Sequence, residues 1–243
     1  MIYGRATSLH VLFQTDDVLV VDKPSGLVVH RGRGFFGSAG SSPGDAGERD
    51  SVVDRLRESG FAHVHTVHRL DRPTSGVLLL ARNVEVARFL SQRFEAHEVQ
   101  KTYWAFVRGA PLEVEALVDQ PVPKDEGAER VPARTRVRCL ATAAVPASPL
   151  REKRISWLEA KPETGRFHQI RRHLKHIGCP ILGDTTYGKS EHNRLARDRF
   201  GLSRLALHAE RLRVMLPNGE LLEVSSPLPP DLGALAAQFE PTR

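Results

Sequence analysis

A loop of turn-forming residues that runs directly into a buried strand constrains this chain more than any other feature. Residues 68–76 read His-Arg-Leu-Asp-Arg-Pro-Thr-Ser-Gly, and an apolar run at 77–80 follows at once. Pro73 presets φ, and Gly76 permits backbone conformations that other residues avoid. The strand anchors the loop, as the scaffold of a catalytic loop must. Asp71, between two arginines, is the candidate reactive group, although local turn hydrogen bonds explain a lone Asp equally well.

Further elements follow from periodicity and turn signals. The chain shows more strands than helices, short connections and no regular βαβ alternation, which predicts an α+β fold with a mixed, mostly antiparallel central sheet flanked by helices. The predicted elements are a strand-turn-strand unit at 18–30, strands at 101–107, 131–140 and 155–160, an antiparallel pair at 205–216 and 221–224, and helices at 51–58, after the cap Asn83, at 166–177 and at 231–239. Residues 31–50, rich in Gly, Ser and Pro, predict a long, mobile surface loop.

Composition narrows the class of protein. The net charge of +6 favours a polyanionic partner, with nucleic acid first. No apolar run approaches the roughly 20 residues of a membrane helix, and no secretory signal is evident. Only two cysteines are present, so neither a disulfide framework nor a Cys-rich zinc site is indicated, and a cytoplasmic location is the default.

Two more blocks carry candidate chemistry. Lys101-Thr102-Tyr103 opens a predicted strand, although a strand tyrosine is commonly just packed against its neighbours. The second block lies at residues 161–174 and is rich in basic groups. If the apolar positions of its helix face the core, Arg171 lies beside the buried stripe but not in it, where it can reach a carboxylate of a neighbouring loop in bidentate fashion. The alternative is an ordinary solvated basic helix.

These blocks together resemble the RluA family of RNA pseudouridine synthases. The matching segments are His-Arg-Leu-Asp-x-x-Thr-Ser-Gly at 68–76, Lys-x-Tyr at 101–103, Gly-Arg-x-His-Gln-Ile-Arg at 165–171, Leu-Gly-Asp at 182–184 and Leu-His-Ala at 207–209. They occur in the family order, and the resemblance spans roughly residues 12–227. It implies the pseudouridine synthase catalytic fold over 1–243, as one domain or two packed lobes, with an active-site cleft across the sheet and no S4-type RNA-binding domain.

The resemblance also implies site residues. Asp71 would be the nucleophile, Tyr103 would stack on the target base and help to remove the C5 proton, and Arg171 would orient Asp71 and favour its ionised form. The isomerisation needs neither a cofactor nor a metal. We expect RNA or substrate contacts from a set of largely basic residues: Arg69, Arg72, Arg166, His168, Gln169, Arg172 and Arg194. The basic strand face at Arg134, Arg136 and Arg138 would add to them.

Within the family, the chain is most similar to the TruC branch, which modifies uridine 65 of tRNA. The supporting segments are Lys-Pro-x-Gly-x-x-Val-His at 23–30, Arg-Arg-His-Leu at 171–174, Asn-Arg at 193–194 and Phe-Gly-Leu at 200–202. We therefore expect tRNA as the partner of a monomeric enzyme. The alternatives are a ribosomal-RNA synthase of the same family and a non-catalytic RNA-binding protein, although the latter leaves the anionic Asp71 on an RNA-facing surface unexplained. A glycosidase would need two carboxylates, and the motifs offer no second one. A metal at His63, His65 and His68 is disfavoured.

Overall fold

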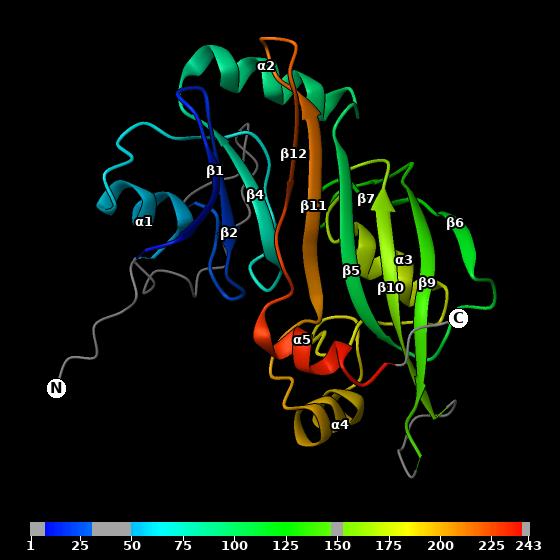
Figure 1. Ribbon diagram of the computed structural model, residues 1–243. Coiled ribbons are helices and arrows are strands. Elements are labelled where there is room, and N and C mark those ends of the chain that lie inside the picture. The colour runs from blue at the N-terminus through cyan, green and yellow to red at the C-terminus, as the bar shows by residue number, and fades with distance from the viewer. Residues whose placement is uncertain (1–7, 31–49, 147–152, 240–243) are drawn as a thin grey trace, which may run out of the picture.

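A single mixed sheet forms the centre of the computed structural model, which describes residues 8–30, 50–146 and 153–239. Its hydrogen-bonded order is β1-β2-β4-β11-β5-β10-β9-β6, with β12 paired to β11 and β3 to β4 (Figure 1). The strands of this sheet are β1 (His10–Gln14), β2 (Val18–Lys23), β3 (His65–Thr66), β4 (Ser75–Ala81), β5 (Gln100–Arg108), β6 (Glu115–Asp119), β9 (Arg134–Ala144), β10 (Arg154–Pro162), β11 (Leu207–Met215) and β12 (Leu221–Ser225). A separate hairpin pairs β7 (Val122–Pro123) with β8 (Arg130–Val131).

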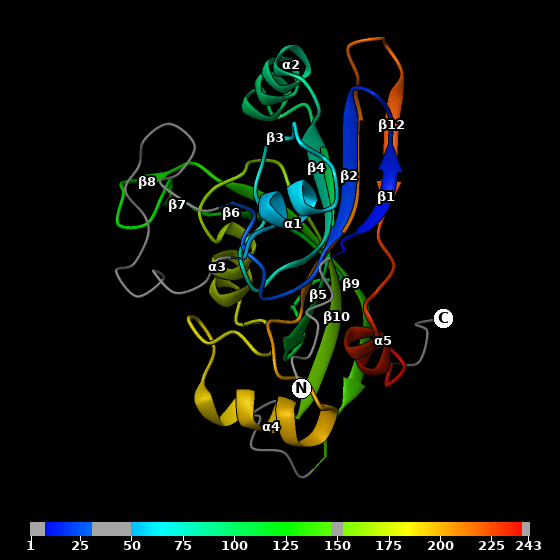
Figure 2. The same cartoon turned by 90° about the vertical axis from the view of Figure 1, so that its left-hand side faces the viewer.

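Five helices accompany these strands within the described residues: α1 (Val52–Glu58), α2 (Val84–Glu95), α3 (Gln169–His176), α4 (Ser190–Phe200) and α5 (Pro230–Ala236). Figure 2 shows α1 and α3 on one side of the sheet and α5 on the other. Every strand pair is antiparallel except β4 with β11, which run parallel over two residue pairs. The predicted α+β class with a mostly antiparallel sheet is confirmed.

Three apolar cores hold the layers together. Strand β2 contributes side chains to two of these cores. Leu19 and Val21 pack in the core with α1, and Val18 and Val20 pack in the core with α2 and β12. The third core joins β5, β9 and β10 to α3, α4 and α5. Alternation of side chains across a strand that is buried on both faces explains why residues 18–21 form a continuous apolar run.

The cap predicted at Asn83 is confirmed, and Ser51, which the sequence analysis placed inside the first helix, caps that helix instead. The Ser51 hydroxyl accepts a hydrogen bond from the backbone N–H of Asp54 and caps α1, and the Asn83 side chain accepts one from Val86 and caps α2. Both caps satisfy N–H groups that a helix cannot pair internally. These helices are therefore set by residues next to them in the sequence.

Other sequence predictions need correction. Residues 27–30 form no second strand, and only an isolated bridge joins Val28 to Ser51. The helix predicted at 166–177 begins at Gln169, because His168 adopts a left-handed conformation with φ of 53°. The sequence analysis missed β1, β6 and α4. The loop predicted at 31–50 lies outside the described residues except for Asp50.

Candidate active site

Ala209 of β11 brings the Asp71 loop and Tyr103 together. It pairs with Gly76 of β4 on one side and with Tyr103 of β5 on the other. Neighbouring strands in a sheet lie about 4.8 Å apart. The backbone at the end of the loop therefore lies roughly 10 Å from the backbone of Tyr103, measured across the sheet. Gly76 has φ of +112°, and a Cβ there would lie 2.1 Å from the Ala209 carbonyl oxygen. Only glycine allows this close approach of β4 and β11.

The loop that carries Asp71 is fixed to the turn that follows β2. The Gly26 N–H donates to the Arg72 carbonyl at 2.8 Å, and the Ser25 hydroxyl donates to the Pro73 carbonyl at 2.7 Å. The Asp71 side chain keeps 24% of its surface exposed. The loop backbone is therefore held from within while the carboxylate stays open to a ligand.

Lys23 is the internal support of this loop. The side chain is fully buried, and its ammonium donates to the carbonyls of Pro24, Leu27 and Arg72 at 2.9, 2.7 and 3.2 Å. Burial lowers the pKa of Lys23 to about 7, against the attraction of Asp71. Three carbonyl acceptors match the three N–H donors of the charged form. The sequence analysis quoted Lys23 within a motif but gave it no role in the site.

Tyr103 packs between two of the cores, on the strand next to β11. Burial raises the pKa of its hydroxyl, and the negative charge of Asp71 raises it further. The hydroxyl therefore keeps its proton at neutral pH. The sequence analysis predicted that Asp71 and Tyr103 share a site, and this stays a prediction.

Arg171 lies deeper than the sequence predicted. Its side chain is only 4% exposed, so it belongs to the buried face of α3 and not to the margin of that face. Its bidentate partner is Asp184, with Nε and Nη2 each 2.8 Å from a carboxylate oxygen, while Nη1 lies 3.6 Å from Asp71. Burial alone would lower the pKa of Arg171, but the hydrogen bonds and charge of Asp184 outweigh it and the net shift is upward. Arg171 thus presents a fixed positive charge to Asp71.

Asp184 is a second carboxylate beside the site, which the sequence analysis quoted in the Leu-Gly-Asp match but did not count when it found no second carboxylate in the motifs. Burial would raise its pKa, but its bonds to Arg171 and to the backbone N–H groups of Thr186 and Tyr187 lower it overall. Both oxygens are engaged and the side chain is 1% exposed. It therefore cannot serve as the second acid or base that a glycosidase needs. The Leu-Gly-Asp match was the only sequence signal for it.

His168 and Tyr187 complete the wall around Asp71. His168 Nε2 lies 3.7 Å from Asp71, and its Nδ1 is 3.0 Å from the Tyr187 hydroxyl. Burial lowers the pKa of His168, against the pull of Asp71, which favours the neutral imidazole. The Tyr187 ring also lies under the guanidinium groups of Arg171 and Arg172, 5.0 Å from each. No sequence motif pointed to Tyr187.

The remaining predicted contact residues differ in exposure. Arg69, Arg72 and Arg194 are exposed, and Arg72 Nε donates to the Gly26 carbonyl. Arg166 is partly buried, and Gln169 is buried with both ends of its amide bonded to protein groups, among them Thr164 and Thr135. In the structure the Gln169 side chain therefore links neighbouring segments of the protein through hydrogen bonds.

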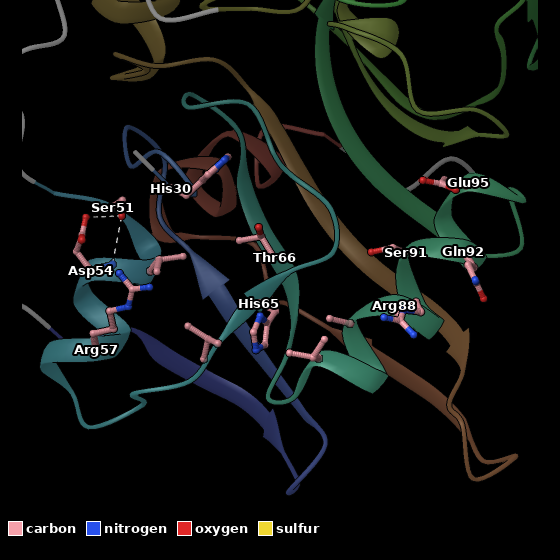
Figure 3. A pocket seen from close by; sticks show the side chains of 14 residues that line it. His30, Ser51, Asp54, Arg57, His65, Thr66, Arg88, Ser91, Gln92 and Glu95 are labelled. Carbon is pink, nitrogen blue, oxygen red and sulfur yellow. Dashed lines mark hydrogen bonds between the residues drawn. The ribbon is translucent and has the colours of Figure 1, made fainter. Parts of the chain in front are cut away.

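A separate cavity of about 690 Å³ lies between α1, β3 and α2 (Figure 3). Its lining mixes acidic and basic side chains such as Asp54, Arg57, Arg88 and Glu95. It contains none of Asp71, Tyr103, His168 and Arg171. The candidate site is therefore not this cavity.

Two further properties concern the part of the chain that the structure describes. No three His, Cys, Asp or Glu side chains gather there in a way that could hold a metal ion. None of the helices described there is long and apolar enough to cross a membrane.

Comparison with known proteins identifies the family. Residues 17–176 match the model for RNA pseudouridylate synthase. A tRNA pseudouridine synthase C of Pectobacterium carotovorum subsp. carotovorum is 43% identical over 227 residues, which cover 88% of this chain but only 57% of that relative. The Yersinia pestis tRNA pseudouridine synthase C is 39% identical over 245 residues, covering 95% of this chain and 91% of that relative.

A solved structure supports the same conclusion. The human RNA Pseudouridylate Synthase Domain Containing 1 has a TM-score of 0.74 and 27% identity, covering all of this chain and 92% of that one. The matches to sequence and structure both extend over the Asp71 loop and α3. The chain therefore belongs to the RluA family of RNA pseudouridylate synthases.

Proposed function

We propose that this protein converts uridine 65 of tRNA to pseudouridine and that Asp71 is the nucleophile. The observation that carries the proposal is an accessible carboxylate 3.6 Å from the fixed cation of Arg171, on a loop whose end, Gly76, is joined to Tyr103 through Ala209 of β11. The relatives named tRNA pseudouridine synthase C support the choice of RNA.

The chemistry balances without a cofactor. The N1–C1′ bond of the target uridine breaks, the uracil turns, and a C5–C1′ bond forms while C5 loses a proton and N1 gains one. Asp71 acts on the sugar of the target nucleotide. Arg171 keeps a positive charge beside the carboxylate throughout.

Tyr103 is proposed to stack under the base and to help move the C5 proton. The raised pKa of its hydroxyl fits a group that donates or relays a proton and does not act as a phenolate. A base that is paired in a tRNA stem must be flipped out to reach this position. Arg69 and Arg72, exposed on either side of Asp71, are proposed to hold phosphates or to fill the gap in the stem.

Distinct surfaces are proposed to bind the rest of the RNA. Helix α4 exposes Arg194 and Arg197. The face of β9 contributes less than its sequence suggests, because Arg134 and Arg136 both lie within ion-pair distance of Glu163. We therefore propose that α3 and α4 contribute more to RNA binding than the basic face of β9. A monomeric state and a cytoplasmic location stay predictions.

The test supplies purified protein, without added cofactor or metal, with bulk tRNA and ribosomal RNA side by side. Mapping of new pseudouridine should find it at tRNA position 65. New pseudouridine confined to ribosomal RNA would contradict the tRNA assignment and leave the chemistry intact. RNA binding without any pseudouridine would favour the non-catalytic alternative.

A further inference from the structure

A group of basic side chains, Lys101, Arg166 and His97, lies near Tyr103 at the start of β5. Lys101 and Tyr103 are two residues apart on this regular strand, so their side chains leave the same face about 7 Å apart. A Cβ at Gly165 would lie 3.9 Å from the Lys101 ammonium, which places that ammonium beside the loop that carries Arg166. Burial lowers the pKa of His97, in the turn between α2 and β5, and the charges of Arg166 and Lys101 lower it further.

These cations have no counter-charge among the residues that the structure describes. Within residues 8–30, 50–146 and 153–239, no carboxylate lies within ion-pair distance of Lys101 or Arg166, and the buried Nε of Arg166 has no hydrogen-bond partner there. Burial lowers the pKa of Lys101 to about 8, and the charge of Arg166 lowers it further. Keeping the positive charges of Lys101 and Arg166 close together in a partly buried environment is unfavourable unless an anion binds between them.

We propose that Lys101 and Arg166, with His97 at the edge, bind one backbone phosphate of the RNA next to the nucleotide whose base lies at Tyr103. This inference rests on the proposed function and adds a defined contact to it. A phosphate is the anion that an RNA brings to this place, and its oxygens suit an ammonium and a guanidinium together. Such a contact fixes the register of the strand on the enzyme without reading its sequence.

The test uses synthetic tRNA stem-loops in which one phosphate at a time, within two nucleotides of the target uridine, is replaced by a neutral methylphosphonate. With the wild-type protein, one of these replacements should raise KM by about tenfold or more, as expected for a lost charged hydrogen bond. With Lys101→Met or Arg166→Met, KM should already be raised, and the same replacement should cost little more. The turnover number should change by no more than about threefold, because a positioning contact is lost and not a reacting group.

The matched control is Lys153→Met. Lys153 is an exposed lysine next to the start of β10, which pairs with the opposite end of β5 from Lys101. This variant removes the same charge and should respond to every methylphosphonate as the wild type does. Lys101→Arg keeps a charge at the site and should recover most of the lost affinity.

A second measurement is independent of catalysis. Tripolyphosphate at constant ionic strength should raise the Tm of the wild type and of Lys153→Met, but not that of Lys101→Met. Equal, additive effects of every methylphosphonate on wild type and Lys101→Met, or an equal rise in Tm, would overturn the inference. If the wild type made no pseudouridine in any tRNA, the proposed function would fail, while this Tm comparison would still decide whether the cations form an anion site.

Discussion

The Arg171 guanidinium donates two hydrogen bonds of 2.8 Å to Asp184 while its third nitrogen lies 3.6 Å from Asp71. One arginine thus makes a bidentate hydrogen-bonded ion pair with the buried carboxylate and a longer-range electrostatic contact with the accessible one. Because Asp184 fixes the position of the Arg171 guanidinium, Asp71 is not needed to hold that cation in place. The Asp71 carboxylate, with 24% of its surface exposed, stays open to a ligand.

Removing the charge of Asp184 should therefore harm both stability and turnover. Asp184→Asn keeps the shape but leaves Arg171 as a buried charge without its main partner, which costs about 3 kcal/mol or more in the free energy of unfolding. Urea unfolding measures the loss. The matched control is Asp231→Asn, because the bidentate pair of Asp231 with Arg204 lies nearer the surface and should cost less. Equal losses in the two variants would contradict a special role for the deeper pair.

The effect of Asp184→Asn on kinetics follows from the same geometry. If Asp184 acts by positioning Arg171, turnover should fall by at least about tenfold while KM changes by less than about threefold. Arg171→Met should lower turnover by about a hundredfold or more. A change confined to KM in both variants would make Arg171 an RNA contact and not a partner of Asp71.

The tyrosine hydroxyl can be tested apart from the ring. Tyr103→Phe keeps the stacking face and should bind RNA normally but form little pseudouridine, while Tyr103→Leu should lose RNA affinity as well. Binding is measured by fluorescence anisotropy and product by pseudouridine mapping. Full activity of Tyr103→Phe would reduce Tyr103 to a stacking surface.

Gly76 should tolerate no side chain. In Gly76→Ala the new methyl group would meet the Ala209 carbonyl oxygen at a φ of +112°. We expect a loss of about 3 kcal/mol or more in the free energy of unfolding, because β4 and β11 must separate. Gly233→Ala is the control, since no atom lies within 4 Å of a Cβ at that helical position. A Gly76→Ala protein as stable as wild type would contradict the close approach of the strands.

The lowered pKa of Lys101 predicts a pH dependence of stability. Between about pH 8, its pKa in the folded protein, and the ordinary value of 10.5, the unfolded chain holds a proton that the folded chain has lost. The free energy of unfolding contributed by Lys101 therefore rises with pH across this window. Urea unfolding between pH 7.5 and 10 should show a shallower rise for Lys101→Met than for Lys153→Met. Identical slopes would show that Lys101 titrates normally.

Local sequence signals predicted the parts of the fold that are set locally. Ser51 and Asn83 cap their helices through atoms three residues away, and the apolar run of β4 is long enough to identify alone. Helix α4 escaped prediction because its sequence is mostly polar and charged. Strand β1 is short, lies at the sheet edge and contains an irregularity in its pairing.

The sequence could name candidate site residues but not their geometry. The motifs singled out Asp71, Tyr103 and Arg171, yet the end of the Asp71 loop lies beside Tyr103 only through Ala209, which is ordinary in sequence. The burial of Arg171 was missed because a charge can be buried only with a partner, and Asp184 lies 13 residues further along the chain. The left-handed backbone of His168, which shortens α3, carries no sequence signal of its own.

The most direct measurement compares Asp71→Asn with the wild type in a single-turnover assay on tRNA, with RNA affinity and Tm measured on the same samples. Asparagine keeps the size of the side chain and removes only its charge. We predict no detectable pseudouridine at position 65, with RNA affinity equal to or slightly tighter than that of the wild type, because a negative charge facing phosphates is lost. Pseudouridine formation above a few per cent of the wild-type rate, at equal folding, would contradict the assignment of Asp71 as the nucleophile.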